Sequence, residues 1–134
     1  MAKRVLAIDD SPVVLRLHAD LLGRAGYQVV VAPNAREGLF KLKDFTPDLI
    51  LLDIRMPGMS GWEFLDRVRE RERLQDVPVI VFSGLPESSP QAQKMADKYS
   101  CYVTKKASGT ELLRLMEEVL GEADVTDDQT GGGG

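Results

Sequence analysis

The segment that decides the fold covers residues 48–54 and reads DLILLDI. It has the length of a strand and is apolar almost throughout, without alternation between apolar and polar positions. A continuous apolar run of this length is typical of a strand buried on both faces, as in a parallel sheet that helices cover on either side. Because Asp53 ends this strand, the segment also brings an acid to the edge of the sheet.

Strands and helices alternate along the rest of the chain as well. Further short apolar runs predict strands at residues 4–8, 28–32, 77–82 and 101–104. Helical spacing of apolar residues predicts helices that begin after Ser11, after Asn34 and near Trp62, and two more at residues 88–98 and 112–119. We therefore predict an α/β fold, a (βα)5 doubly wound sheet of five parallel strands in a single domain with right-handed crossovers.

Composition bounds the class of protein. The chain has 134 residues, 43% of them apolar and 28% charged, which is close to the average of soluble globular domains. No apolar run is long enough to span a bilayer, and no secretory signal precedes the first strand. A single cysteine, Cys101, excludes an internal disulfide framework and a cysteine-based zinc site. We expect the protein to be cytoplasmic.

The net charge of −4 is concentrated at one end of the chain. Residues 121–134 read GEADVTDDQTGGGG and contain acids but no lysine or arginine, so residues 1–120 are neutral overall. We predict a folded domain at 1–120 and an acidic, Gly-ended flexible tail or linker at 121–134. Residues 66–73 mix acids with arginines and are typical of a solvated helix face, so we expect no direct binding of nucleic acid.

Polar side chains follow four of the five predicted strands. Asp9 and Asp10 follow the first strand, Asp53 ends the third, Ser83 follows the fourth and Lys105 follows the fifth. Because the carboxyl ends of parallel strands meet at one edge of the sheet, we expect these residues to converge where such sheets bind their ligands. An aspartate at a strand end is by itself often a helix cap, but the combination is more specific.

Three converging carboxylates would repel one another unless a cation neutralises them. Oxygen ligands favour Mg²⁺, Ca²⁺ or Mn²⁺, and a shallow site with few carboxylates fits Mg²⁺, which often shares its coordination sphere with a phosphate. A cation, a lysine and a hydroxyl together suit a phosphoryl group. A carboxylate beside the metal could then act as a nucleophile and form an aspartyl phosphate.

These motifs resemble the receiver domain of two-component response regulators, which has the CheY-like fold. The matching segments are VLAIDDSP (5–12), PDLILLDIRMPGMSGWEFL (47–65), VPVIVFSG (77–84) and YVTKKASGTELL (102–113). The resemblance covers residues 3–120. It implies that Asp53 is the phosphoacceptor, which takes a phosphoryl group from a sensor histidine kinase, a phosphotransfer protein or a small phosphodonor.

The resemblance also implies a metal site and a switch. Asp10 and Asp53 would bind Mg²⁺ (or Mn²⁺) directly, Asp9 would act largely through metal-bound water, and the backbone carbonyl of Arg55 would complete the protein ligands. Ser83 would bind the phosphoryl oxygen and Lys105 would pair with the phosphoryl charge. Tyr102 would be the aromatic switch residue, which turns inward when Ser83 is drawn towards the phosphate.

The implied output is a shift in population across the face formed by residues 84–120. The partner would be a downstream protein or a fused output domain, and phosphorylation-linked homodimerisation is possible; no membrane partner is expected. The domain would not be a conventional enzyme, because it would catalyse only its own phosphorylation and dephosphorylation at Asp53. Three places depart from the family pattern: Lys106 stands where proline is usual, Lys98-Tyr99 where Gly-Ala is common, and Gly84 where alanine is commoner.

Two other classes of function stay open at this point. A pseudo-receiver would keep the fold and signal by binding alone, and Lys106 keeps that reading possible. A metal-dependent phosphatase with an aspartyl intermediate would need more chain to recognise its substrate. Outside the predicted site, we expect His18 to be a solvent-exposed structural residue and Cys101 to be a small buried hydrophobe.

Overall fold

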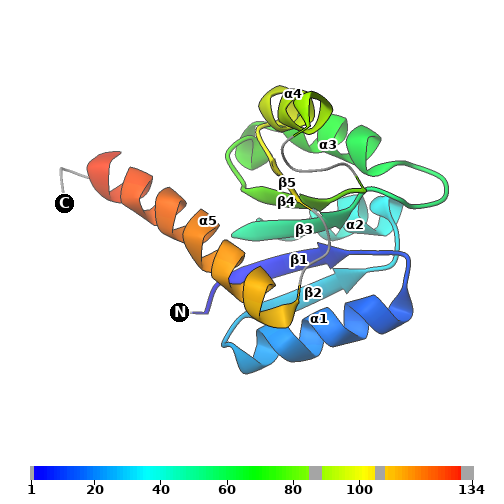
Figure 1. The fold of residues 1–134 in the computed structure, drawn as a ribbon, viewed down its shortest axis with the longest axis horizontal. Helices are drawn as coiled ribbons and strands as arrows, with labels where there is room; N and C mark the ends of the chain where they lie inside the picture. The colour runs from blue at the N-terminus through cyan, green and yellow to red at the C-terminus, as the bar shows by residue number, and fades with distance from the viewer. Residues whose placement is uncertain (1, 85–88, 105–107, 131–134) are drawn as a thin grey trace.

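The computed structural model describes residues 2–84, 89–104 and 108–130. Five parallel strands form one sheet in the order β2-β1-β3-β4-β5 (Figure 1). The strands are β1 (Arg4–Ile8), β2 (Gln28–Ala32), β3 (Leu49–Asp53), β4 (Val79–Phe82) and β5 (Tyr102–Thr104). The helices are α1 (Pro12–Arg24), α2 (Ala35–Lys41), α3 (Gly61–Glu70), the short 3₁₀ helix η1 (Glu72–Leu74), α4 (Pro90–Tyr99) and α5 (Gly109–Thr130). The predicted doubly wound α/β fold is confirmed.

Each central strand supplies side chains to two cores. In β1, Leu6 and Ile8 pack towards α2 and α3, whereas Val5 and Ala7 pack towards α1 and α5. All five residues of β3 are buried, which is why residues 48–54 lack the alternation of a half-exposed strand. The helices thus cover the sheet in two layers, α1 and α5 on one face and α2, α3 and α4 on the other (Figure 1).

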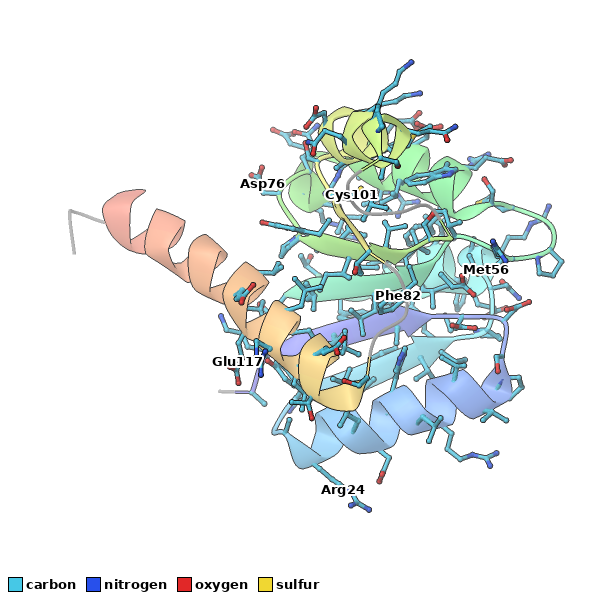
Figure 2. All side chains as sticks on the ribbon, in the orientation of Figure 1. Arg24, Met56, Asp76, Phe82, Cys101 and Glu117 are labelled. Carbon is cyan, nitrogen blue, oxygen red and sulfur yellow. The ribbon has the colours of Figure 1, made fainter. Side chains whose placement is uncertain are left out.

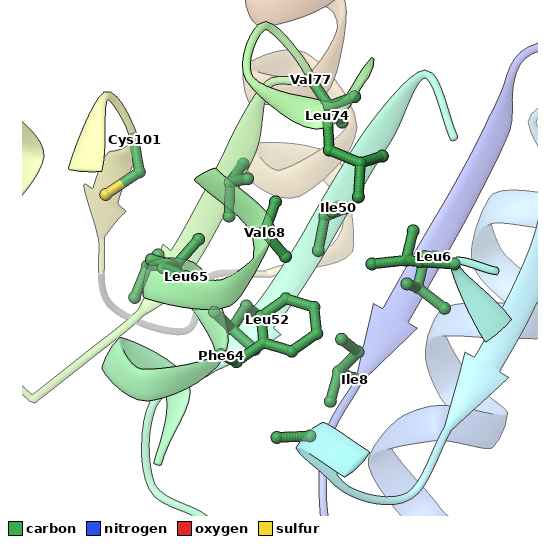
Figure 3. Packing of buried hydrophobic residues seen from close by; sticks show 14 of the residues in the cluster. Leu6, Ile8, Ile50, Leu52, Phe64, Leu65, Val68, Leu74, Val77 and Cys101 are labelled. Carbon is green, nitrogen blue, oxygen red and sulfur yellow. The ribbon is translucent and has the colours of Figure 1, made fainter. Parts of the chain in front are cut away.

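The core under α3 is the more aromatic of the two. Phe64, Leu65 and Val68 come from one side of α3 and lie over Ile50 and Leu52 of β3 (Figure 3). Figure 2 shows Cys101 on this side of the sheet, whereas Phe82 of β4 lies on the side of α1 and α5. These two packed layers hold the carboxyl ends of β1, β3 and β4 in a fixed arrangement, and that edge carries the candidate site.

Side-chain caps begin the first two helices where the sequence predicts them. The Ser11 hydroxyl accepts a hydrogen bond from the backbone N–H of Val14 at 3.3 Å, and Pro12 occupies the first turn of α1. The Asn34 side chain accepts from the N–H of Glu37 at 2.9 Å at the start of α2. These caps are local signals, and for that reason the sequence alone was enough to find them.

The last helix runs further than the apolar pattern predicts. The helix α5 continues to Thr130, and its second half projects away from the sheet (Figure 1). Residues 122–130 contain no glycine or proline, so nothing in the sequence stops the helix before Gly131. The backbone of residues 121–130 is therefore helical in the segment that we assigned to a flexible tail. The division into a domain at 1–120 and a tail at 121–134 stays a prediction.

Two arginines of the charged segment 66–73 make hydrogen bonds that hold the fold. Arg73 is exposed, as expected of a solvated face, but our description is wrong for Arg69. Arg69 is half-buried and donates hydrogen bonds of 2.9 to 3.0 Å to five backbone carbonyls, those of Leu74, Gln75, Val77, Tyr99 and Ser100. Arg73 donates to the carbonyls of Leu42 and Phe45 and to the hydroxyl of Thr46. The guanidinium groups thus tie α3 and η1 to the loops beside them.

The two residues expected to be unremarkable have different outcomes. Cys101 is buried as predicted, and burial raises the pKa of its thiol to about 11, with the positive charge of Arg69 acting in the opposite direction. His18 is half-buried rather than solvent-exposed, and its ring centroid lies 5.8 Å from that of Phe82. In the described part of the chain, none of the helices has the length and hydropathy needed to cross a bilayer.

Candidate functional site

Three aspartates meet at the carboxyl edge of the sheet. Asp9 and Asp10 follow β1 and Asp53 ends β3, and these two strands are neighbours with Ile8 in register with Leu52. One carboxylate oxygen from each aspartate lies within 4.8 Å of the other two. The structure thus brings together the three acids that the sequence analysis selected, at the point between β1 and β3 where the chain order reverses.

Backbone N–H groups orient the two buried carboxylates. The exposed fractions of Asp9 and Asp53 are 2% and 7%, whereas Asp10 is exposed. The N–H of Ser11 donates to Oδ1 of Asp9 at 2.9 Å, and the N–H of Arg55 donates to Oδ1 of Asp53 at 3.1 Å. These hydrogen bonds fix the orientation of both carboxylates. The site therefore offers two fixed acids at its base and one accessible acid at its rim.

Ser83 lies at the adjacent strand end. Asp53 is in register with Phe82, and the N–H of Ile54 donates to the Phe82 carbonyl at 3.1 Å. The next residue, Ser83, is half-buried, and its N–H donates to the carbonyl of Thr104 at 2.8 Å. These bonds hold the ends of β3, β4 and β5 side by side, so the hydroxyl residue and the acids share one edge of the sheet.

Of the other predicted residues, the described structure places Tyr102 but does not include Lys105. Lys105 and Lys106 lie outside the described residues. Tyr102 begins β5 opposite Ile80, and its exposed fraction is 38%. It lines a cleft of about 780 Å³ between α4 and α5, together with Thr104. The switch role of Tyr102 and the phosphate-pairing role of Lys105 stay predictions.

Gly61 is a contributor to the site that the sequence analysis missed. A Cβ at this position would clash with the Ile54 side chain and would lie 3.0 Å from the Ile54 Cα and 3.2 Å from the Asp53 carbonyl oxygen. The absence of a side chain therefore lets the start of α3 sit directly on the end of β3. The signal in the sequence was a glycine directly after the capping Ser60, whose hydroxyl accepts from the N–H of Glu63 at 3.2 Å.

Comparisons with known proteins identify the family. The family model described as the response regulator receiver domain matches residues 5–117. The chain belongs to this family. The receiver domain is 32% identical over 114 residues to an uncharacterised 14.6 kDa protein of Leptolyngbya boryana, covering 85% of this chain and 87% of that one. It is 27% identical to the polar-differentiation response regulator DivK of Brucella anthropi, covering 92% of this chain and 100% of DivK.

Longer relatives contain the receiver as one part. The phosphate regulon transcriptional regulatory protein PhoB of Pseudomonas aeruginosa is 32% identical over 120 residues, which make up 90% of this chain and 52% of PhoB. A protein-glutamate methylesterase of Anaeromyxobacter dehalogenans is 46% identical over 85 residues, which make up 63% of this chain and only 24% of that protein. Receiver domains with fused output domains therefore occur among the relatives.

Solved structures agree with the fold. The chemotaxis protein CheY4 of Vibrio cholerae superposes with a TM-score of 0.81 at 28% identity, covering 89% of this chain and 99% of CheY4. The response regulator TrrA of Thermotoga maritima, solved in complex with Mg²⁺ and beryllofluoride, superposes with a TM-score of 0.73 at 30% identity, covering 87% and 98%. This chain is thus a receiver domain of two-component signalling, and the family resemblance found in the sequence is confirmed. A binding module that acts without phosphorylation is not favoured.

Proposed function

We propose that Asp53 of this receiver domain accepts a phosphoryl group from the phosphohistidine of a sensor histidine kinase or a phosphotransfer protein. The observation that carries the proposal is the cluster of Asp9, Asp10 and Asp53 at the carboxyl edge of the sheet, with their oxygens within 4.8 Å of one another. Receiver domains as a family bind Mg²⁺ in such an acidic pocket and receive phosphoryl groups from histidine kinases. Asp53 is the acid of the cluster that lies beside β4 and Ser83.

The donor set fits a hard divalent cation. All three side chains offer oxygen, and carboxylates this close together repel one another, so a bound cation would offset that repulsion. Asp10 and Asp53 would hold Mg²⁺ (or Mn²⁺) directly, Asp9 would act through water, and the backbone carbonyl of Arg55 would complete the protein ligands. When bound, the cation supplies charge neutralisation for the incoming phosphoryl oxygens.

The reaction needs little movement of the protein. One oxygen of Asp53 forms a bond to phosphorus, while the bond from phosphorus to the imidazole nitrogen breaks and its electron pair returns to the ring. The Arg55 N–H on Oδ1 holds the plane of the carboxylate during this exchange. In dephosphorylation, a water molecule attacks phosphorus and the bond from phosphorus to the Asp53 oxygen breaks. Asp53 then leaves as a carboxylate. Most of the rate gain would come from positioning and charge, as in other phosphoryl transfers.

The proposed signal runs from the phosphoryl group to the last third of the fold. Ser83 would bind a phosphoryl oxygen, Lys105 would pair with the phosphoryl charge, and Tyr102 would turn inward. The cleft between α4 and α5, which Tyr102 lines in its exposed position, would then change shape and alter binding of a downstream protein, a fused output domain or a second copy.

The proposal is tested with acetyl phosphate and Mg²⁺, followed by intact-mass measurement. We expect one phosphoryl adduct on the native chain and none on Asp53→Asn. The matched control is Asp66→Asn on α3, an exposed acid outside the cluster, which should be phosphorylated like the native chain. An unmodified native chain would support a pseudo-receiver that signals by binding alone. Repeated turnover of an external phosphomonoester would support a phosphatase.

A further inference from the structure

The C-terminal end of α4 is stacked on the first turn of α3. The rings of Trp62 and Tyr99 have their centroids 5.3 Å apart and their planes 18° from parallel. The exposed fraction of Tyr99 is 6%, and the ammonium group of Lys98 lies 5.1 Å from the centroid of the same ring. Offset stacking and a cation near the ring both stabilise such an arrangement. The two helices, which lie side by side (Figure 1), are therefore joined by an aromatic contact at one end of α4.

Arg69 holds the backbone at the same end of α4. Its Nε donates to the carbonyl of Tyr99 at 2.9 Å, and its Nη2 donates to the carbonyl of Ser100 at 3.0 Å. Ser100 ends the helix in the left-handed conformation, with a φ of 53°, and its own N–H donates to the carbonyl of Ala96. The last turn of α4 is thus closed within the helix and tied to α3 from outside. We refer to Trp62, Arg69 and Tyr99 together as the clamp.

The clamp is itself fixed to the end of β3. Trp62 directly follows Gly61, where an added Cβ would lie 3.2 Å from the carbonyl oxygen of Asp53. Arg69 also donates to the carbonyl of Val77, two residues before β4, at 2.9 Å. Because protein interiors are close-packed, the start of α3 cannot shift along β3 without moving these groups. The C-terminal end of α4 is therefore held by the same elements that carry the phosphoacceptor.

The N-terminal half of α4 has much weaker support. Ala92 is buried there but contributes only a methyl group, Met95 is partly buried, and Gln93 and Lys94 are exposed. Another face of the helix borders the cleft of about 780 Å³, which α4 lines with Ala92, Gln93, Ala96, Asp97 and Ser100. A segment with little buried apolar surface opens at a lower free energy than one that buries an aromatic ring. The helix is thus firmly held at Tyr99 and weakly held at Ala92.

We propose that the clamp is a hinge: when Asp53 is phosphorylated, the C-terminal end of α4 stays on α3 and its N-terminal end, around Ala92 and Gln93, moves. The inference rests on the proposed function of Asp53 and specifies which part of the output face responds. The cleft changes shape at Ala92 and Gln93 and keeps its shape at the other end of α4. The hinge depends on the departure from the family pattern at Lys98-Tyr99. A glycine at 98 would favour an earlier end of the helix, and an alanine at 99 has no ring to stack on Trp62.

The first test is residue-resolved amide hydrogen exchange by NMR on the native chain, with Mg²⁺ alone and with Mg²⁺ plus beryllofluoride, an analogue of the phosphoryl group. We expect beryllofluoride to change the exchange rates of residues 93–95 by about tenfold or more, and those of residues 98–100 by less than about twofold. The hinge is overturned if both ends of α4 change by similar factors, or if neither end changes while the site binds beryllofluoride.

The same spectra separate this inference from the proposed function. The amide signals of Arg55 and Ser83 report binding of beryllofluoride beside Asp53. A native chain in which these signals do not respond would contradict the proposed function, whereas a response there with equal changes along the whole of α4 would overturn the hinge alone.

The second test removes the ring. In Tyr99→Ala we expect the protection of residues 98–100 from exchange to fall about tenfold, and the change caused by beryllofluoride to spread to these residues. Exchange is compared with that of Leu51 and Leu52 in β3, which corrects for any change in the stability of the whole domain. Trp62→Ala should act like Tyr99→Ala, and the double variant should add little to either.

Tyr99→Phe is the matched control, because it keeps the ring and should behave like the native chain. The hinge is overturned if Tyr99→Ala leaves exchange at residues 98–100 unchanged, or if Tyr99→Phe loses as much protection as Tyr99→Ala. The comparison within the native chain needs no substitution, so it decides the question even if Tyr99→Ala does not fold.

Discussion

Arg69 holds the ends of three elements together from one position on α3. Its guanidinium donates to carbonyls at the end of η1, before β4 and at the end of α4. We expect Arg69→Met to lower the free energy of unfolding by about 2–4 kcal/mol, because several part-buried carbonyls lose their charged donor together. Urea denaturation measures the difference. The matched control is Arg67→Met, at an exposed position of the same helix, which should change stability by less than about 0.5 kcal/mol.

Equal effects of the two substitutions would contradict the network. The contrast also shows what the sequence could not predict. Arginines alternate with other residues from Arg67 to Arg73, and nothing in the local pattern separates Arg69 from its neighbours. Its partners Tyr99 and Ser100 lie 30 and 31 residues further along the chain. A hydrogen bond to a distant carbonyl depends on the tertiary fold, so periodicity could not reveal it.

At the scale of elements, the sequence signals are local, and the predicted boundaries are accurate where such local signals are strong. The ranges predicted for the first two strands, 4–8 and 28–32, are those of β1 and β2, because apolar runs and caps mark both ends. The helix α4 begins at Pro90, two residues after the predicted start at 88, and α5 ends at Thr130, eleven residues beyond the predicted end at 119. Neither boundary has a strong apolar pattern: α4 is mostly polar, and α5 has no stop signal before Gly131.

Packing between elements makes a sharper prediction at Gly38. A Cβ there would lie 2.6 Å from Cδ1 of Ile8 and 3.1 Å from Cε1 of Phe64, and both side chains are buried. Gly38→Ala should therefore destabilise the domain by about 1–2 kcal/mol, since overpacking outweighs the gain in helix propensity. Gly23 of α1 meets nothing within 4 Å, so Gly23→Ala should stabilise by up to about 1 kcal/mol.

Thermal or urea unfolding of Gly38→Ala and Gly23→Ala measures both changes in stability. We expect the free energy of unfolding to fall in the first variant and to rise in the second. A Gly38→Ala variant as stable as the native chain would mean that α2 can move away from β1 at little cost, which would contradict the tight packing of this layer.

At the scale of the whole molecule, the topology explains why so much of the site could be predicted. Asp9 and Asp53 are 44 residues apart in sequence, but a parallel sheet with β1 next to β3 brings every carboxyl strand end to the same edge. This convergence of strand ends does not predict how the side chains at that edge are oriented. The contact of Arg55 with Gly84, the fit of Gly61 on the end of β3 and the exposure of Tyr102 depend on atomic packing.

The convergence of three acids has a consequence for the stability of the entire domain. Mutual repulsion of Asp9, Asp10 and Asp53 in the folded state is relieved on unfolding, so a divalent cation that binds only the folded state should stabilise it. With Mg²⁺ at ten times its dissociation constant, we expect a gain of about 1.4 kcal/mol in the free energy of unfolding. Thermal melts with Mg²⁺, and with NaCl at equal ionic strength, measure the specific part of the gain.

Asp10 provides the control, because it is the exposed member of the cluster and its replacement leaves the core intact. Asp10→Asn removes one of the three repelling charges, so without Mg²⁺ it should be at least as stable as the native chain. The same substitution removes a proposed ligand, so most of the gain from Mg²⁺ should disappear. An equal gain from Mg²⁺ in both chains would place the bound cation elsewhere. Loss of stability without Mg²⁺ would mean that Asp10 supports the fold and does not strain it.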